Sequence, residues 1–121
     1  MLGVEKVTGT GWMTAGLAWW SDSHPANWTG DGTKLISNGS NGDLAKSGFW
    51  TTGKTYRTKT THIINSGSLY GPYDWSTGGF DHTVSGNATE YHVPTTAYIS
   101  MRSVLLNGTI TAFSVKEVLM P

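Results

Sequence analysis

The chain has no cysteine, little charge and no long apolar run, and each absence removes a class of protein. Without cysteine in its 121 residues, it has no disulfide, no thiolate nucleophile and no zinc–sulfur site. No stretch approaches the roughly 18 apolar residues that a membrane helix needs. The first residues also lack the basic and then apolar run of a signal peptide. We therefore expect a protein that is made in a cytosol and leaves by assembly or lysis, or an excised domain.

The small charge content also limits the partners. Charged residues make up 13% of the sequence, and eight basic and eight acidic side chains cancel to a formal net charge of +0. A surface that binds nucleic acid needs an excess of basic side chains to contact phosphates. The sequence therefore predicts no nucleic-acid partner and no membrane insertion. Its polarity comes instead from Thr, Ser, Asn and 16 Gly, which are typical of solvated strands and tight turns.

The pattern of the chain has the period of β-strands. Gly or Pro interrupts nearly every window of 12 residues, which leaves no segment long enough for a long helix. Turn signals such as Asn38-Gly39 and Asn107-Gly108 tolerate the positive φ that tight hairpins require. One domain over residues 1–121 is expected, an all-β antiparallel β-sandwich of jelly-roll type. The predicted strands span residues 2–8, 11–18, 33–37, 43–50, 54–65, 68–74, 79–84, 88–93, 97–106 and 109–118.

Strand alternation separates the core from the surface. In the predicted strand 97–106 the apolar residues fall on one face, and in 109–118 their spacing of three and then two predicts a bulge near residues 111–112. The expected core residues are Ile99, Met101, Leu105, Phe113 and Val115. Three further rings are assigned to packing: Trp12, Trp28 and Phe80.

One predicted strand is polar on both faces. Tyr56, Thr58, Thr60 and His62 share one side of it, and Arg57, Lys59 and Thr61 share the other. Such a strand is either solvated on both sides at its middle or lines a groove.

Two short motifs carry a resemblance to a known family. Gly53-Lys-Thr-Tyr-Arg57 opens a strand, and Gly108-Thr-Ile-Thr-Ala-Phe-Ser-Val-Lys-Glu-Val118 closes the chain. Together they resemble the lectin-like jelly-roll modules of bacteriophage structural proteins, which look like carbohydrate-binding modules of the galactose-binding type. The resemblance covers roughly residues 12–118, and it implies that the last strand returns beside the first. The polar strand over 54–65 departs from the family, where apolar residues alternate.

The aromatic residues supply the candidate binding site. Six Trp in 121 residues exceed what one small core needs, and indole faces can stack on the C–H faces of sugars. Two groups lie in predicted loops and could form a sugar platform, with carboxylates orienting hydroxyl groups. The candidate residues are Trp19, Trp20, Asp22, Tyr73, Asp74 and Trp75. The alternative is that these rings cap the ends of the sandwich.

Metal binding and catalysis have weaker signals. The four histidines, His24, His62, His82 and His92, show no H-x-H or H-E-x-x-H spacing, so no metal site and no cofactor are predicted. A structural calcium ion is implied by the resemblance alone, because no D-x-D-x-D loop appears. Glycoside hydrolysis needs two facing carboxylates, and no G-x-S-x-G nucleophile elbow is present. We therefore expect a protein that is not an enzyme. Four segments match the N-x-S/T glycosylation pattern, and we interpret them as turns and not as glycosylation sites.

With these exclusions, the resemblance implies a non-catalytic phage virion module that decorates the capsid or forms part of a head or tail fibre. Its expected partners are other virion proteins and host or environmental glycans, and a homotrimer is the commonest state of such fibres. Two alternatives stay open. The module could pack against capsid or tail proteins without binding sugar, or it could be a carbohydrate-binding module of a secreted glycosidase.

Overall fold

The computed structural model describes residues 1–21, 27–74 and 80–119, and within them the chain is almost entirely sheet. All strand pairs are antiparallel and belong to one hydrogen-bonded network. No helix in this part of the chain is long and apolar enough to cross a membrane. The prediction of an all-β antiparallel fold is confirmed. In chain order the elements are β1 (Leu2–Glu5), the 3-10 helix η1 (Gly11–Met13), β2 (Trp28–Gly30), β3 (Leu35–Asn38), β4 (Gly42–Lys46), β5 (Tyr56–Tyr73), β6 (Asp81–His82), β7 (Gly86–His92) and β8 (Ile99–Val118).

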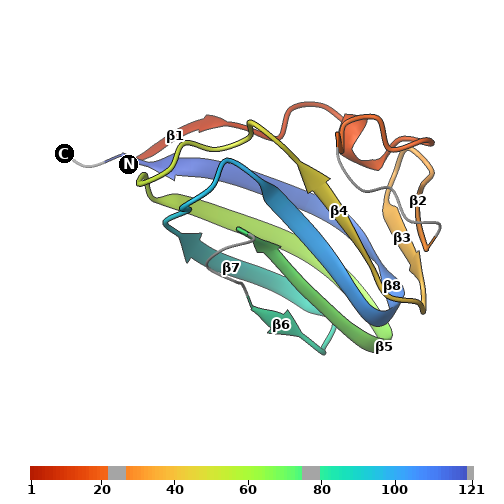
Figure 1. Cartoon of the computed structure of the whole chain (residues 1–121). Coiled ribbons are helices and arrows are strands. Elements are labelled where there is room, and N and C mark those ends of the chain that lie inside the picture. The colour runs from red at the N-terminus through yellow and green to blue at the C-terminus, as the bar shows by residue number, and fades with distance from the viewer. Residues whose placement is uncertain (22–26, 75–79, 120–121) are drawn as a thin grey trace.

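Two long strands organise the sandwich. β5 and β8 pair from Tyr56 opposite Glu117 to Tyr73 opposite Ser100. Figure 1 shows both strands bending back on themselves near their middles, at the lower right of the view. The first half of β5 and the second half of β8 form one layer with β1 and β7, and the other two halves form a second layer with β4 and β6. Strands that pass from one layer to the other in this way enclose a core between the layers.

The bend in β8 falls where the ladder shifts register. Between Ser66 and Ser68 on β5, one residue opposes two on β8, and Leu105 there has a φ of 53°. The β5 residue is Gly67, with a φ of +72°, and a Cβ on it would lie 2.0 Å from the carbonyl oxygen of Leu105. The bulge therefore needs a glycine and turns the following side chains by one position. For this reason the prediction that Leu105 is buried is wrong: Leu105 is 58% exposed and Leu106 takes the core position.

The signal Asn107-Gly108 does not form a hairpin turn, so the separation of strands 97–106 and 109–118 is wrong. Both residues lie inside the β8 ladder, opposite β3 and β5. A Cβ on Gly108 would lie 2.2 Å from the carbonyl oxygen of Ile63. The glycine is therefore required by the close approach of two backbones and not by a turn. Segments 54–65 and 68–74 are likewise one strand.

Two other predictions about the closing strand are confirmed. Thr61 lies opposite Ala112 and His62 opposite Ile110, so Thr111 is the extra residue of a bulge. β1 pairs with the end of β8, with Leu2 opposite Val118 and Glu5 opposite Lys116, and the two segments lie alongside each other in Figure 1. The last strand thus returns beside the first.

The core is unusually rich in rings. The segment predicted as a strand over 11–18 is instead η1 followed by turns, which lay Trp12, Leu17 and Trp20 over the core. Trp28 is also buried, as predicted, whereas Phe80 is 51% exposed and the packing role expected for it is wrong. The core cluster consists of Val7, Trp12, Leu17, Trp20, Trp28, Leu35, Leu44, Phe49, Trp50, Tyr56, Leu69, Ile99, Met101, Leu106, Ile110, Phe113 and Val115.

Candidate functional site

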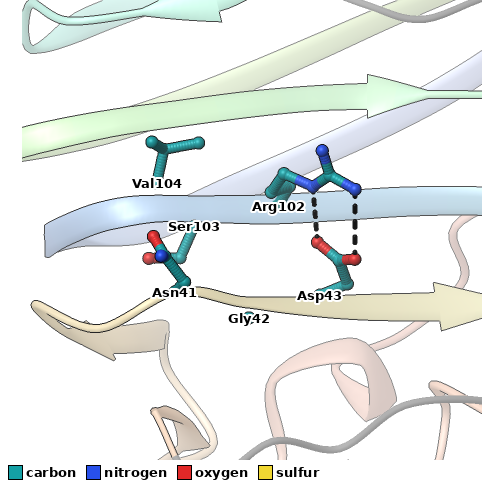
Figure 2. Close-up of a pocket in the computed structure, with 6 residues that line it drawn as sticks. All are labelled: Asn41, Gly42, Asp43, Arg102, Ser103 and Val104. Atoms are coloured by element: carbon teal, nitrogen blue, oxygen red, sulfur yellow. Dashed lines mark hydrogen bonds and ion pairs between the residues drawn. The ribbon is translucent and has the colours of Figure 1, made fainter.

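An open pocket of about 420 Å³ lies where β4 runs beside the first half of β8. Asp43 and Arg102 are directly opposite each other in the ladder, so their side chains project from the same face of the sheet. Nε of Arg102 donates to Oδ1 of Asp43 at 2.9 Å, and Nη2 lies 3.5 Å from Oδ2. Figure 2 shows the two side chains meeting across the strands. The lining residues are Asn41, Gly42, Asp43, Arg102, Ser103 and Val104.

The Arg102 guanidinium is held from two sides. It lies 5.8 Å from the centre of the Tyr73 ring, and Tyr70 is its ladder neighbour on β5. The hydrogen bond to Asp43 raises the pKa of Arg102 further above its ordinary value. Burial raises the pKa of Tyr73, so this phenol stays neutral. The pocket therefore contains a positively charged guanidinium held beside a carboxylate, and the charges of the two groups cancel.

The remaining lining groups provide hydrogen-bonding capacity at one end. Asn41 accepts a bond from the Leu105 backbone N–H through Oδ1 at 2.9 Å, and no described residue takes up its Nδ2 donors. Ser103 is already committed, because its hydroxyl donates to the carbonyl of Ser40. The free groups of the pocket are thus amide and guanidinium donors beside a carboxylate acceptor. A ligand that carries neighbouring hydroxyl groups can match such a set, because each hydroxyl both donates and accepts.

The first predicted aromatic group does not form a sugar platform. Trp20 is fully buried, donates its indole N–H to the carbonyl of Trp12 at 2.8 Å and stacks on Phe113. Trp19 is half-buried, and Nζ of Lys46 lies 4.6 Å from its ring centre while donating to its carbonyl. Trp20 has no face open to a ligand, so the site prediction is wrong for this residue, and Lys46 lies over the ring of Trp19. The rings instead close one end of the core.

In the second predicted group, the two residues that the structure describes, Tyr73 and Asp74, stabilise the fold. Tyr73 is buried beneath Arg102. Asp74 is fully buried and accepts bonds from Thr95 N at 2.6 Å, from Thr96 N at 3.3 Å and from the Thr95 hydroxyl at 3.2 Å. Its carboxylate therefore orders residues 95 and 96 and has no room to orient a sugar hydroxyl. The other two candidates, Asp22 and Trp75, lie outside the described residues.

Sequence reasoning missed Asp43, Arg102 and Asn41. A single exposed charge in a strand, such as Arg102, is an ordinary feature and does not by itself indicate a site. What makes it part of a site is its pairing with Asp43, 59 residues away in the chain. Nothing in the local pattern shows that these two strands are neighbours.

The polar side chains predicted for the strand over 54–65 lie on β5 and belong to a second cluster, inside the sandwich. Thr58, Thr60 and His62 are buried and face inward, so the strand is neither solvated on both sides nor exposed in a groove. The inward residues of β7 next to them include Glu90 and His92. Across the layers, His82 of β6 places Nε2 2.5 Å from Oε1 of Glu90.

Glu90 is the centre of this cluster. It is only 8% exposed, and its second oxygen lies 3.6 Å from Nε2 of His92. Burial by itself raises the pKa of Glu90, but the contacts with His82 and His92 outweigh it and leave the pKa lowered. Burial lowers the pKa of His62, whose ring centre is 4.9 Å from that of His82. The cluster ties β6 to β7 and closes the edge between the two layers.

The cluster lacks the geometry of a metal centre. The two imidazoles approach different oxygens of the same carboxylate, and no group of three or more His, Asp or Glu among the described residues is arranged to hold a metal ion. The structural calcium implied by the resemblance thus has no candidate set of side chains in this part of the chain.

Comparisons of the chain with protein-family models, with curated proteins and with solved structures found no match.

Proposed function

We propose that this chain is a non-catalytic β-sandwich module of a phage virion that binds a glycan in the pocket between β4 and β8. The observation that carries the proposal is the Asp43–Arg102 pair beside the Asn41 amide in an open hollow of about 420 Å³. Ligand sites join a concave surface to a few fixed polar groups. Here the polar groups are both donors and acceptors, with no net charge in sum, which suits a neutral sugar ring.

The same pocket argues against hydrolysis. Of its six lining residues only Asp43 is a carboxylate, whereas a glycosidase uses two carboxyl groups on opposite sides of the scissile bond. Both oxygens of Asp43 already face the Arg102 guanidinium, at 2.9 and 3.5 Å. Binding without bond cleavage is the function that the geometry favours.

The virion assignment rests on the resemblance of the Gly53–Arg57 and Gly108–Val118 motifs to phage modules. An open pocket of this size supports weak binding at one site. Many copies on one particle, as homotrimers or other repeated units, would convert weak binding into firm attachment.

The test is binding of host-surface polysaccharide and a glycan array to the wild-type chain and to Arg102→Gln and Asp43→Asn variants. Asp43→Asn keeps the side-chain shape, Arg102→Gln leaves a shorter neutral amide, and each substitution removes the charged pair. We expect each to weaken glycan binding at least tenfold, because loss of a charged hydrogen-bonding partner costs about 1.5–3 kcal/mol. Lys54→Gln, which breaks the exposed pair with Glu117, is the control and should bind normally.

Two outcomes would favour the alternatives. If the chain binds no glycan but still attaches to particles, it is a purely structural decoration protein. If its gene adjoins a catalytic glycosidase domain and not capsid or tail genes, it is a carbohydrate-binding module of a secreted enzyme. Binding that is unchanged in both pocket variants would place the glycan site elsewhere.

A further inference from the structure

The outer face of the layer formed by β7, β5 and the second half of β8 carries a cluster of positive charge. Arg57 on β5 lies opposite both Lys116 on β8 and Tyr91 on β7. Two residues along β5, Lys59 projects from the same face. Residues directly opposite on one face have their Cβ atoms about 5 Å apart, and positions two apart on a strand are about 7 Å apart. Three of the eight basic side chains of a chain with no net charge therefore share one small area.

These three cations have no ion-pair partner in the part of the chain that the structure describes. None of Arg57, Lys59 and Lys116 forms an ion pair with a described residue, whereas Lys34, Lys54 and Arg102 all do. In addition, Nε of Arg57 is buried and has no hydrogen-bond acceptor within the described chain. Like charges opposite each other destabilise a sheet, so the Arg57–Lys116 pair costs stability unless an anion lies on it.

The acidic groups nearby leave the face with a net positive charge. Glu5 is the nearest in register, opposite Lys116 on β1. Its carboxylate accepts bonds from the backbone N–H groups of Val7 and Val115, at 3.2 and 2.7 Å, and from the Ser114 hydroxyl. Glu90 projects from the opposite side of β7, into the sandwich.

The uncharged neighbours suggest the kind of anion. Tyr91 is 60% exposed beside Arg57, which leaves an aromatic ring open at the edge of the basic area. In the next row Lys59 lies between Ser114 and Thr89, and the exposed Thr89 hydroxyl can bond to a polyol. A duplex-binding protein contacts about six to ten phosphates, more than three cations can match. A single-stranded nucleic acid is bound by a series of stacked aromatic rings, and this face has one.

We propose that this face is a second binding surface, for an acidic polysaccharide whose carboxylate or sulfate groups lie over Arg57, Lys59 and Lys116 and one of whose sugar rings stacks on Tyr91. The inference does not depend on the pocket between β4 and β8, which lies on the other layer and carries no net charge.

The experiment measures binding of dextran sulfate and polygalacturonate to the full chain at low ionic strength, with uncharged dextran as the reference polymer. We expect both polyanions to bind and dextran not to bind through this face. Arg57→Gln and Lys59→Gln should each weaken polyanion binding about two- to fivefold and lower the slope of log K against log salt by about one. Tyr91→Ser should weaken binding to both polysaccharides about threefold but leave binding of inorganic polyphosphate unchanged.

A matched control separates this surface from a general effect of charge. Lys34→Gln removes the same charge at the exposed pair with Asp31 and should bind polyanions within about twofold of the wild type. Each variant is first shown to melt near the wild-type temperature.

Any of four results would overturn the proposal. These are no binding of either polyanion at low salt, equal binding by the Arg57→Gln and Lys59→Gln variants, no effect of Tyr91→Ser on polysaccharide binding, and tighter binding of single-stranded DNA than of both polysaccharides at matched charge.

Discussion

Phe113→Ala should be among the most damaging single substitutions in this chain. Phe113 is 7% exposed and lies on the inner face of β8. Its ring contacts three indoles, with centroid distances of 5.7 Å to Trp12, 6.1 Å to Trp20 and 6.3 Å to Trp19. These rings come from the segment before β2, so Phe113 joins that segment to the sheet.

The expected cost follows from these contacts. Truncation of a buried Phe to Ala costs about 3–5 kcal/mol through lost burial and the cavity that remains. Because each ring pair adds about 0.5–1.5 kcal/mol and rigid indoles cannot collapse into the space, we expect about 4–5 kcal/mol. For a domain of this size that lowers the melting temperature by roughly 15 °C and removes much of a total stability of about 5–15 kcal/mol.

The measurement is denaturant and thermal unfolding followed by tryptophan fluorescence and far-ultraviolet circular dichroism. Phe80→Ala is the matched control, because Phe80 is 51% exposed and packs edge-on against His92; it should cost about 1 kcal/mol or less. If Phe113→Ala does not fold at all, Phe113→Leu gives a milder comparison. The reasoning is refuted if Phe113→Ala melts within about 2 °C of the wild type, or if Phe80→Ala costs as much.

The other predictions concern the bulge and the buried cluster. Leu106→Ala should cost about 2–5 kcal/mol and Leu105→Ala less than about 1 kcal/mol, since the bulge buries the first and exposes the second; the reverse order in denaturant unfolding would contradict the assigned register. The unfolding free energy should fall on acidification. The pKa of His62 is lowered, so its contribution is complete above about pH 6.5 and is lost as the pH falls below that value. The pKa of Glu90 is also lowered, so its contribution is complete above about pH 4.5 and is lost as the pH falls through the folded-state pKa. In pH-dependent denaturation His62→Gln should flatten the upper part of the profile and Glu90→Gln the lower part, and an unchanged profile in both variants would rule out this role of the cluster.

The buried cluster also helps to hold β6, a short strand at the edge of the sheet. β6 has only two residues and pairs with β5 through Leu69 and Tyr70. The contact of His82 with Glu90 adds a link from β6 to the other layer. The polar inner face of β5 is stable here because its buried groups have partners on β7 and on β5 itself, Thr58 with His92 and Thr60 with His62. Acidification should loosen β6 before it unfolds the sandwich.

The sequence by itself determined the class of fold and part of the core. Strand alternation is a local property, so it identified Ile99, Met101 and Val115 as buried and predicted the bulge at Thr111. The absence of uninterrupted helix-length segments likewise predicted an all-β chain. These features depend only on which side of a strand each residue faces.

Only the tertiary structure decided the rest. The glycine at 108 was expected in a turn, but it permits close approach to Ile63, and this depends on a strand more than 40 residues away. The exposure of loop tryptophans could not be predicted, because Trp20 is buried by Phe113 from the other end of the chain. The Asp43–Arg102 pair and the basic face exist because antiparallel register places distant residues opposite each other, and register is set by long-range pairing and bulges, which local sequence does not specify.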